Sequence, residues 1–193
     1  MASNVAYDRK PVYLAPSSGS GTYARSTIKR VVQRPDPILM ATAFEVDPLD
    51  PAVVALAHAL VETMRASPAC IGLAAPQVGE PVRLFCMDVT GHPKARSCSG
   101  LVVLANPRIM QRKGEVVLRE GCMSVQHLTG NVARATDVVV VGVEPGTGRV
   151  RRIEANGMEA RCLQHEIDHL DGYVFVDRVR DKSKDLFARK SYG

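Results

Sequence analysis

The sequence predicts an α+β fold in which short antiparallel or mixed strands pack around a central helix. Three observations support this expectation. A run of apolar residues with helical spacing lies near the start, several short β-rich runs fill the middle, and a second helical pattern follows them. Because the strands are grouped and do not alternate with helices, an α+β fold is favoured over a parallel α/β one.

Residues 1–27 are expected to form a flexible N-terminal arm or to be a tag, and residues 28–193 to form a single domain. The segment APSSGSGTYARS is rich in Ser and Gly and has no apolar period that a core could bury. The arm is also poor in acids. Organellar import is therefore a second possibility beside the cytoplasmic location that we expect.

Charge and apolar content exclude several classes of protein. The formal net charge of +5 belongs to residues 1–34, since the rest of the chain carries equal numbers of basic and acidic side chains. That rest is poor in aromatics, so no direct contact with nucleic acid is expected. No apolar run approaches the roughly 18 residues of a membrane helix, so no membrane contact is expected either.

The first helix is expected to begin after Asp50, because Pro51 at the next position is typical of a helix start. Apolar residues then recur with helical spacing at Val53, Val54, Leu56, Ala57, Leu60, Val61 and Met64. This period predicts a helix of about 16 residues with one buried face.

The middle of the chain is expected to form strands. Five runs are rich in β-branched residues, and Gly, Pro, Asn or Asp separates several of them. These runs are VRLFCMD, LVVLANP, GEVVLREG, DVVVVGVEP and VRRIEA. Gly146 and Gly148 lie between the last two, which predicts a hairpin.

The second helix is expected to begin at Asn156, whose side chain could cap it, with Glu159 completing a capping box. It should end at Leu170, where Gly172 supplies a stop signal. We expect the run YVFVD to form a short strand after it. A charged, helical tail should then begin at Arg178.

The helix contains the motif QHEIDHL, in which His165 and His169 are four residues apart. Imidazoles at this spacing lie one above the other and can bind one cation. Glu166, about 100° further round the helix, could then reach a water on that cation. A buried core helix with two satisfied histidines is the plain alternative. A chance match to this motif is an event on the order of 1 %, so the metal interpretation is favoured.

Two histidines cannot hold a catalytic ion alone, so a third ligand must come from elsewhere in the chain. The candidates are the remaining histidines (His58, His92 and His127), a carboxylate and a thiolate. A distant His or Glu would indicate a zinc endopeptidase. Four protein ligands would instead indicate a closed, structural metal site.

Two further motifs precede the helix: CIGLAAPQ at residues 70–77 and EGCMSV at residues 120–125. Together with QHEIDHL they form an ordered set that resembles the peptide deformylase family. The resemblance covers roughly residues 30 to 180. It implies a single catalytic domain with a peptide deformylase-like fold, built around a central metal-binding helix.

The resemblance also implies an activity. Cys122, His165 and His169 would hold one divalent metal ion, and Glu166 would be the general acid/base. A metal-bound hydroxide would attack the formyl group of an N-terminal formyl-methionine, and formate would be released. Iron(II) is the native ion that the resemblance implies. Zinc, nickel or cobalt could also occupy the site.

Other roles follow from the same resemblance. The Gln77 side chain and the backbone N–H of Met123 would stabilise the oxyanion. Glu120 and Gln164 would support the ligands from behind. The substrate pocket is expected to contain Ile71, Gly72, Gly121 and Leu128.

The implied partners are N-formyl-methionyl nascent polypeptides and, transiently, the ribosome. We expect the protein to act as a monomer.

The chain departs from the family pattern in two segments, and one residue rivals the expected thiolate. Cys70 stands where the family has glycine, and Gln126 and His127 replace a frequent Pro-Gly. Cys162 lies on the helix face of the histidines. However, it is seven residues from His169, about 10 Å along the axis, which is too far for both to bind one ion.

Overall fold

The computed structural model describes residues 27–189, so the arm or tag expected over residues 1–27 lies, apart from Thr27, outside the described residues. The expected α+β fold is confirmed. In chain order the elements are η1 (Pro37–Met40), α1 (Pro51–Ala66), β1 (Gly72–Ala74), η2 (Ala75–Val78), β2 (Leu84–Met87), β3 (Val102–Lys113), β4 (Val116–Cys122), β5 (Val125–Arg134), β6 (Asp137–Val143), β7 (Val150–Asn156), α2 (Gly157–Leu170), α3 (Phe175–Arg178), α4 (Lys182–Asp185) and β8 (Leu186–Ala188).

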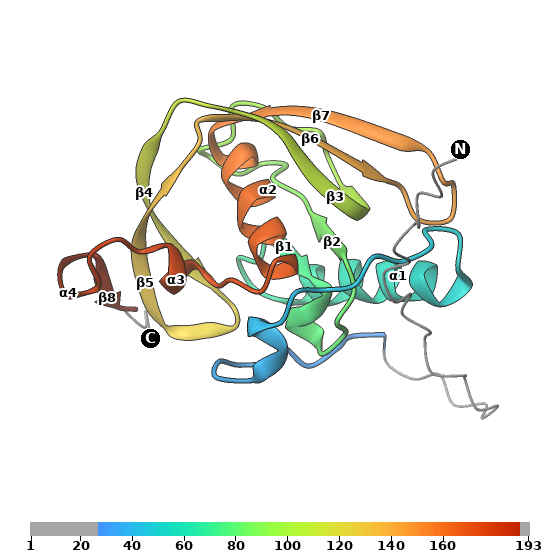
Figure 1. Ribbon diagram of the computed structural model, residues 1–193, viewed down its shortest axis with the longest axis horizontal. Coiled ribbons are helices and arrows are strands. Elements are labelled where there is room, and N and C mark those ends of the chain that lie inside the picture. The colour runs from blue at the N-terminus through green and yellow to red at the C-terminus, as the bar shows by residue number, and fades with distance from the viewer. Residues whose placement is uncertain (1–26, 190–193) are drawn as a thin grey trace, which may run out of the picture.

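The strands form two antiparallel sheets with α2 between them (Figure 1). The five-stranded sheet has the order β1-β2-β3-β6-β7, and the three-stranded sheet has the order β4-β5-β8. The predicted hairpin is present: β6 and β7 pair from Asp137 opposite Asn156 to Val143 opposite Val150. β3 is longer than its apolar run predicts, because its second half continues to pair with β6 through two irregularities in register.

Helix α1 begins as predicted. The Asp50 carboxylate accepts a hydrogen bond from the Ala52 N–H at 2.8 Å, and Pro51 occupies the first turn. Leu60 and Met64 on its buried face pack with Leu84 in one hydrophobic cluster. α1 therefore covers the β1–β2 end of the larger sheet. No helix within residues 27–189 has the length and apolar content to cross a membrane.

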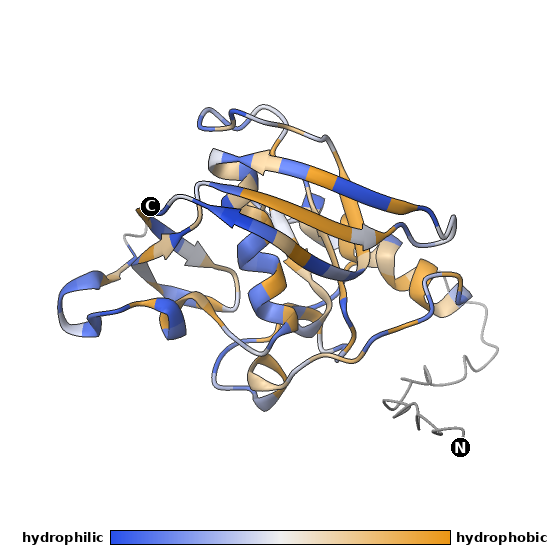
Figure 2. Ribbon diagram, turned by 45° about the horizontal axis from the view of Figure 1, so that its top comes forward, coloured by the Kyte–Doolittle hydropathy of each residue, from blue (hydrophilic) through white to orange (hydrophobic). Residues whose placement is uncertain are grey.

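Helix α2 is buried on nearly all sides. Leu163, Ile167 and Leu170 pack with Phe85 and Val140 of the larger sheet in a second cluster. Both hydrophobic and hydrophilic residues occur along α2 (Figure 2). The buried polar residues among them cannot face water, so each needs a partner inside the protein or a ligand.

The predicted cap of α2 was wrong. Asn156 precedes the helix, but its side chain makes no capping hydrogen bond. Glu159 also does not reach back to it, because Glu159 Oε1 accepts a hydrogen bond from the Ser99 N–H at 2.6 Å. Asn156 instead ends β7, and Gly157 turns the chain with a φ of +58°. The helix start is therefore set by the turn and by the loop that contains Ser99.

The predicted end of the chain was also wrong. The run YVFVD forms no strand, because Phe175 and Val176 turn inward as part of α3 and join a third hydrophobic cluster. The charged tail is helical only in α4. It then forms β8, which pairs with β5 through Leu186 opposite Gly130. Pairing with an open sheet edge thus decides the conformation of this segment.

Candidate metal centre

Three potential metal ligands converge from two elements. Cys122 ends β4, and His165 and His169 lie one turn apart on α2. Their donor atoms all lie within 4.8 Å of one another, and Cys122 Sγ is 3.2 Å from His169 Nε2. The thiolate among the third-ligand candidates is therefore the one brought to the histidines. His58, His92 and His127 lie outside this donor group.

The surroundings favour a thiolate at Cys122. Burial by itself raises the pKa of this thiol. His169 and His165 outweigh burial, so the pKa of Cys122 lies well below its usual value. The sulfur also lies near two N–H groups, Gln77 Nε2 at 3.3 Å and the Ser124 backbone N–H at 3.4 Å. A thiolate with neutral imidazoles is the form in which these side chains bind a metal.

A buried ionic network holds His165 from behind. Glu120 Oε2 lies 3.0 Å from His165 Nδ1, which leaves Nε2 on the side of Cys122. Arg134 donates to both oxygens of Glu120, at 2.9 and 3.0 Å. These contacts hold the pKa of Glu120 near 2, against the effect of burial. Glu120 therefore contacts His165 in its charged form.

The network continues to the C-terminal segment. Arg134 also pairs with Asp168, and Asp168 accepts from Arg178 at 2.6 Å. Sequence reasoning did not identify Arg134. The available signal was its place on a strand paired with the EGCMSV strand, which needs the register of β4 and β5 to be known.

Gln164, the other expected support, holds the middle of α2 against the chain before β6. Its side chain donates to the carbonyls of Ala135 and Ala160, and accepts from the Ala135 N–H at 3.0 Å. All of these partners are backbone groups. Gln164 thus fixes the helix that carries the histidines, without contacting the metal donors directly.

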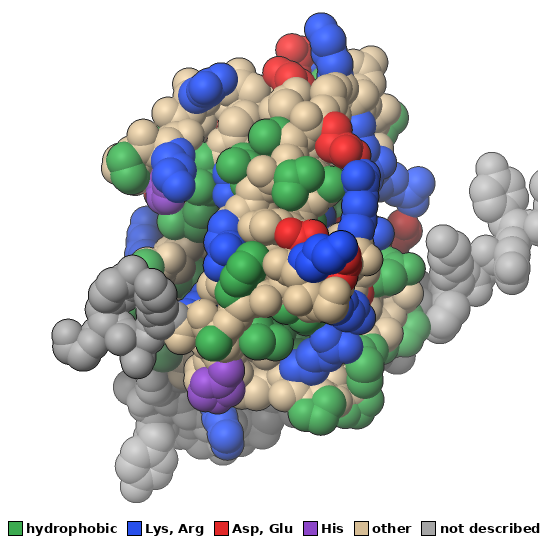
Figure 3. Space-filling view, turned by 90° about the vertical axis from the view of Figure 1, so that its left-hand side faces the viewer, with side chains coloured by type: hydrophobic (Ala, Val, Ile, Leu, Met, Phe, Trp, Pro, Cys, Tyr) green, Lys and Arg blue, Asp and Glu red, His purple; other side chains and the backbone are tan. Residues whose placement is uncertain are grey.

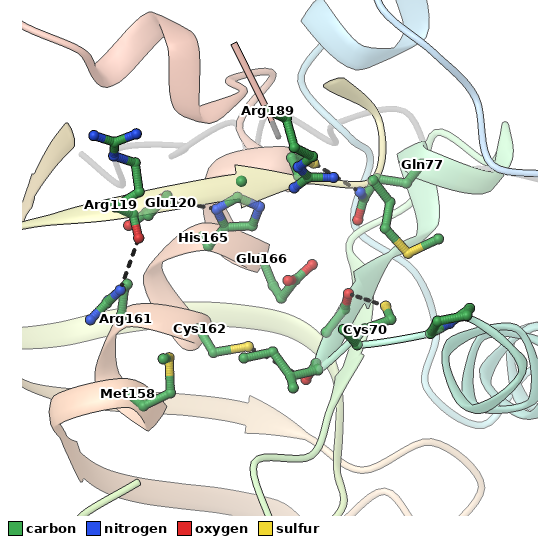
Figure 4. Close-up of a pocket in the computed structure, with 17 residues that line it drawn as sticks. Cys70, Gln77, Arg119, Glu120, Met158, Arg161, Cys162, His165, Glu166 and Arg189 are labelled. Atoms are coloured by element: carbon green, nitrogen blue, oxygen red, sulfur yellow. Dashed lines mark hydrogen bonds and ion pairs between the residues drawn. The ribbon is translucent and has the colours of Figure 1, made fainter. Parts of the chain in front are cut away.

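Glu166 is buried in the centre, and its burial raises its pKa to about 7. Its Oε2 has no hydrogen-bond partner among residues 27–189. Figure 4 shows the carboxylate between His165 and Cys70. A methyl group on Gly72 would collide with Glu166 Oε1, and would lie 2.9 Å from the sulfur of Cys162. Glycine at position 72 therefore makes the space that this carboxylate occupies.

A cavity of about 320 Å³ opens beside these groups (Figure 4). Most of the predicted pocket and oxyanion residues line it: Ile71, Gly72, Gln77, Gly121 and Met123. Leu128, also expected there, does not line it. Its side chain packs against the third hydrophobic cluster, which contains Phe175, because β5 turns that residue away. The wall includes residues that the sequence did not indicate: Arg119, Met158, Arg161 and Arg189.

Cys162, the rival thiolate, stays outside the donor group. Its S–H lies 3.6 Å from the Ile71 carbonyl, and burial raises its pKa well above the usual value. Cys70, the departure from the family glycine, donates to the Gly72 carbonyl at 3.2 Å, and burial raises its pKa to about 12. Both thiols are therefore protonated wall groups of the cavity.

Comparisons with known proteins agree with this geometry. The family model for polypeptide deformylase matches residues 28–185. Peptide deformylase of Syntrophobacter fumaroxidans is 42% identical over 156 residues, covering 81% of this chain and 89% of that protein. The crystal structure of a peptide deformylase from Ehrlichia chaffeensis superposes with a TM-score of 0.74 at 32% identity, covering 81% of this chain and 90% of that one. The structure from Synechococcus elongatus, in complex with actinonin, gives 0.72 at 32% identity and covers 90% of each chain.

Proposed function

The chain belongs to the peptide deformylase family, and we propose that it removes the formyl group from the N-terminal formyl-methionine of newly synthesised polypeptides. It is a metallohydrolase with peptide deformylase activity, and its metal site consists of Cys122, His165 and His169. One observation carries the proposal. Three donors from two elements meet beside a cavity, and the buried carboxylate of Glu166 lines that cavity.

The donor set fits a divalent ion. Two imidazole nitrogens and one thiolate sulfur, arranged around one point, match an open site with a fourth, exchangeable position. An ion bound there would polarise the formyl carbonyl and would lower the pKa of a water molecule. We propose iron(II) as the native ion, on the ground of the family resemblance. Zinc, nickel and cobalt suit the same nitrogen and sulfur donors.

Glu166 is proposed as the general acid/base. Its pKa of about 7 lets the carboxylate take a proton from water and return it to the leaving amine. Its unpartnered Oε2 is available for that proton, since no described side chain occupies it. Gly72 leaves the carboxylate free to stay beside the donors.

Gln77 and Met123 are proposed to stabilise the oxyanion. The Gln77 carbonyl oxygen accepts from the Ala74 N–H at 2.9 Å, so its NH₂ group is turned toward the sulfur of Cys122. The backbone N–H of Met123 follows Cys122 directly, and Met123 lines the cavity. Donors fixed in this way need no reorganisation when negative charge develops on the formyl oxygen.

The methionine side chain is proposed to enter the cavity past Ile71, Gly72 and Gly121. Met158 and Cys162 add apolar sulfur-containing surface to the same wall. A volume of about 320 Å³ lies at the small end of the range of roughly 300–1,000 Å³ for ligand sites. This size suits one residue with its formyl group and leaves the following residues at the rim.

The cellular setting is proposed from the substrate. Formylated chains arise on ribosomes, so we place the protein in the cytoplasm, in transient contact with ribosomes. Import into an organelle that makes formylated chains is the alternative. We propose a single catalytic domain over residues 28–193 that acts as a monomer. Imaging of the full chain and of a variant lacking residues 1–26 tests the location.

The activity itself is tested by anaerobic purification with metal analysis, followed by a formate assay. A formyl-Met-Ala-Ser peptide should release formate in proportion to bound metal, and its unformylated counterpart should stay intact. Cleavage of internal peptide bonds in the unformylated peptide would instead indicate an endopeptidase. A bound metal without either reaction would indicate a structural site.

A further inference from the structure

Three arginines line the cavity of the candidate site. Arg119 comes from β4, Arg161 from α2, and Arg189 directly follows β8 (Figure 4). Among residues 27–189, only two carboxylates, Glu120 and Glu166, share this wall. The balance of charge at the cavity therefore depends on which of these groups are already paired.

Glu120 is fully engaged elsewhere. Both of its oxygens accept from Arg134, and one also contacts His165. It therefore has no oxygen left for a cation at the rim. Glu166 lies beside the metal donors and is needed there for proton transfer. Neither carboxylate forms an ion pair with a rim arginine among the described residues.

Arg119 has its own partners within the smaller sheet. It donates to Asn131 Oδ1 at 3.3 Å and to Thr129 Oγ1 at 3.2 Å, and its guanidinium stacks 3.4 Å from the ring centre of Phe187. These contacts hold it against the sheet. Arg119 thus contributes positive charge to the rim but is not free to turn toward a ligand.

Arg161 is different, because it is half-buried and most of its N–H groups make no hydrogen bond to a described residue. Of its five N–H groups, one donates to the Arg119 carbonyl at 3.2 Å, and no carboxylate within residues 27–189 pairs with it. Burial lowers its pKa, and the nearby charge of Glu120, which is bound to Arg134 and His165, offsets that effect only in part. A guanidinium in this state favours a planar, negatively charged ligand.

Arg189 approaches from the opposite element. Its backbone N–H donates to the His127 carbonyl at 2.9 Å, which fixes the end of β8 beside β5. Its guanidinium lies directly over Gly121, where any side chain at position 121 would collide with it. No described carboxylate pairs with it. Lys and Arg side chains are also prominent on the face that α4, β4, β5 and β8 present (Figure 3).

We infer that Arg161 and Arg189 make the enzyme prefer nascent chains with an acidic residue at the second or third position. This inference rests on the proposed function. The small cavity takes formyl-methionine, so the next residues pass between these two arginines. An extended peptide turns successive side chains to opposite sides, so one position faces each wall. A carboxylate there forms charge-assisted hydrogen bonds with a guanidinium.

The test measures kcat/KM for matched peptides with amidated C-termini, which remove the terminal carboxylate as a second anion. Formyl-Met-Glu-Ala-amide is compared with formyl-Met-Gln-Ala-amide, and formyl-Met-Ala-Glu-amide with formyl-Met-Ala-Gln-amide. At low salt we expect the Glu peptide of at least one pair to be preferred about fivefold, as suits a partly exposed ion pair. The preference should shrink at high salt.

Substitutions of the two arginines show which of them causes the preference for the Glu peptides. Arg161→Gln or Arg189→Gln should bring the Glu/Gln ratio close to one, while Arg161→Lys should keep part of it. Arg180→Gln is the matched control. Arg180 is exposed and pairs with Glu115, so its substitution removes the same charge away from the cavity. Its ratio should equal that of the parent protein.

The outcomes separate the two proposals. Hydrolysis of all four peptides with Glu/Gln ratios of one or less would overturn the inference and leave the deformylase function intact. A preference that survives in both Gln variants would overturn it as well. No formate from any peptide, by metal-loaded protein, would contradict the proposed function itself.

Discussion

The metal centre and the C-terminal segment 173–189 are joined through Asp168 and Arg178, yet they are built differently. Cys122, His169 and Glu166 are almost completely buried and lie on long elements with many neighbours. The C-terminal segment has two single-turn helices and a three-residue strand, and much of it is exposed. One region is a buried interior; the other is a segment whose first half joins a buried cluster with Cys122 and whose second half forms an exposed rim.

The two regions should therefore respond differently to substitution. At the metal centre a single atom matters, because each donor or carboxylate has a chemical task that no neighbour can perform. In the C-terminal segment Phe175 and Val176 are buried, but the strand and stacking contacts of Phe187 are partly exposed, so these contribute modestly and mainly to stability. Substitutions in the first region should therefore stop the reaction in a folded protein, and those in the second should weaken the fold or alter the rim.

The largest effect is expected from Cys122→Ser. A serine hydroxyl is a poor ligand for a divalent ion of this type, so metal retention and formate release should both be lost. Metal content per protein after dialysis is the measurement. Cys162→Ser is the matched control and should retain the ion. Metal loss in Cys162→Ser, with retention in Cys122→Ser, would reverse the ligand assignment.

Glu166→Gln should have the second-largest effect. The amide has nearly the same shape but cannot carry the proton, so kcat should fall by roughly 10²- to 10⁴-fold while the metal stays bound. Steady-state formate release and metal analysis on the same sample check this. Unchanged kcat in the metal-loaded variant would remove Glu166 from the role of acid/base.

Glu120→Gln should affect metal binding through His165, the ligand that Glu120 contacts. Loss of the charge facing His165 is expected to weaken metal affinity by roughly 10- to 100-fold. Competition with a chelator of known affinity measures this. Glu115→Gln, an exposed carboxylate paired with Arg180, should leave the affinity unchanged. Equal affinity in the two variants would show that the buried pair does not support the site.

Phe187→Ala should give the smallest effect. It tests the C-terminal segment and not the metal centre. It removes the ring under Arg119 and part of the packing of β8, at a cost of about 1 kcal/mol in the free energy of unfolding. Urea unfolding measures this, and the bound metal per chain should not change. A loss of metal in this variant would mean that the rim and the centre are a single unit.

The contrast also explains what the sequence could predict. The helix with His165 and His169, the start of α1 at Asp50 and the third ligand Cys122 are encoded in short motifs. Their residue types are required by chemistry or by a local hydrogen bond. Residues tens of positions apart could be assigned correctly because the motifs were read together as a set.

The remainder depended on tertiary partners. Asn156 looked like a cap, but β7 pairing and the loop of Ser99 took over that helix end. Phe175 and Val176 looked like a strand, yet they join the third hydrophobic cluster, which includes Val132 of β5. The pairing of Leu186 with Gly130, and the roles of Arg134 and Arg189, require the register of the smaller sheet. None of these is visible in local propensity.

The position of Cys122 has a mechanical consequence. This sulfur ends the smaller sheet, whereas both imidazoles belong to the helix packed on the larger one. An ion held by all three is thus a cross-link between the two layers, and the unfolded chain offers no such arrangement. Each tenfold rise in free metal above the dissociation constant should add about 1.4 kcal/mol of resistance to unfolding. The melting temperature of the protein therefore serves as a gauge of how much of it is loaded.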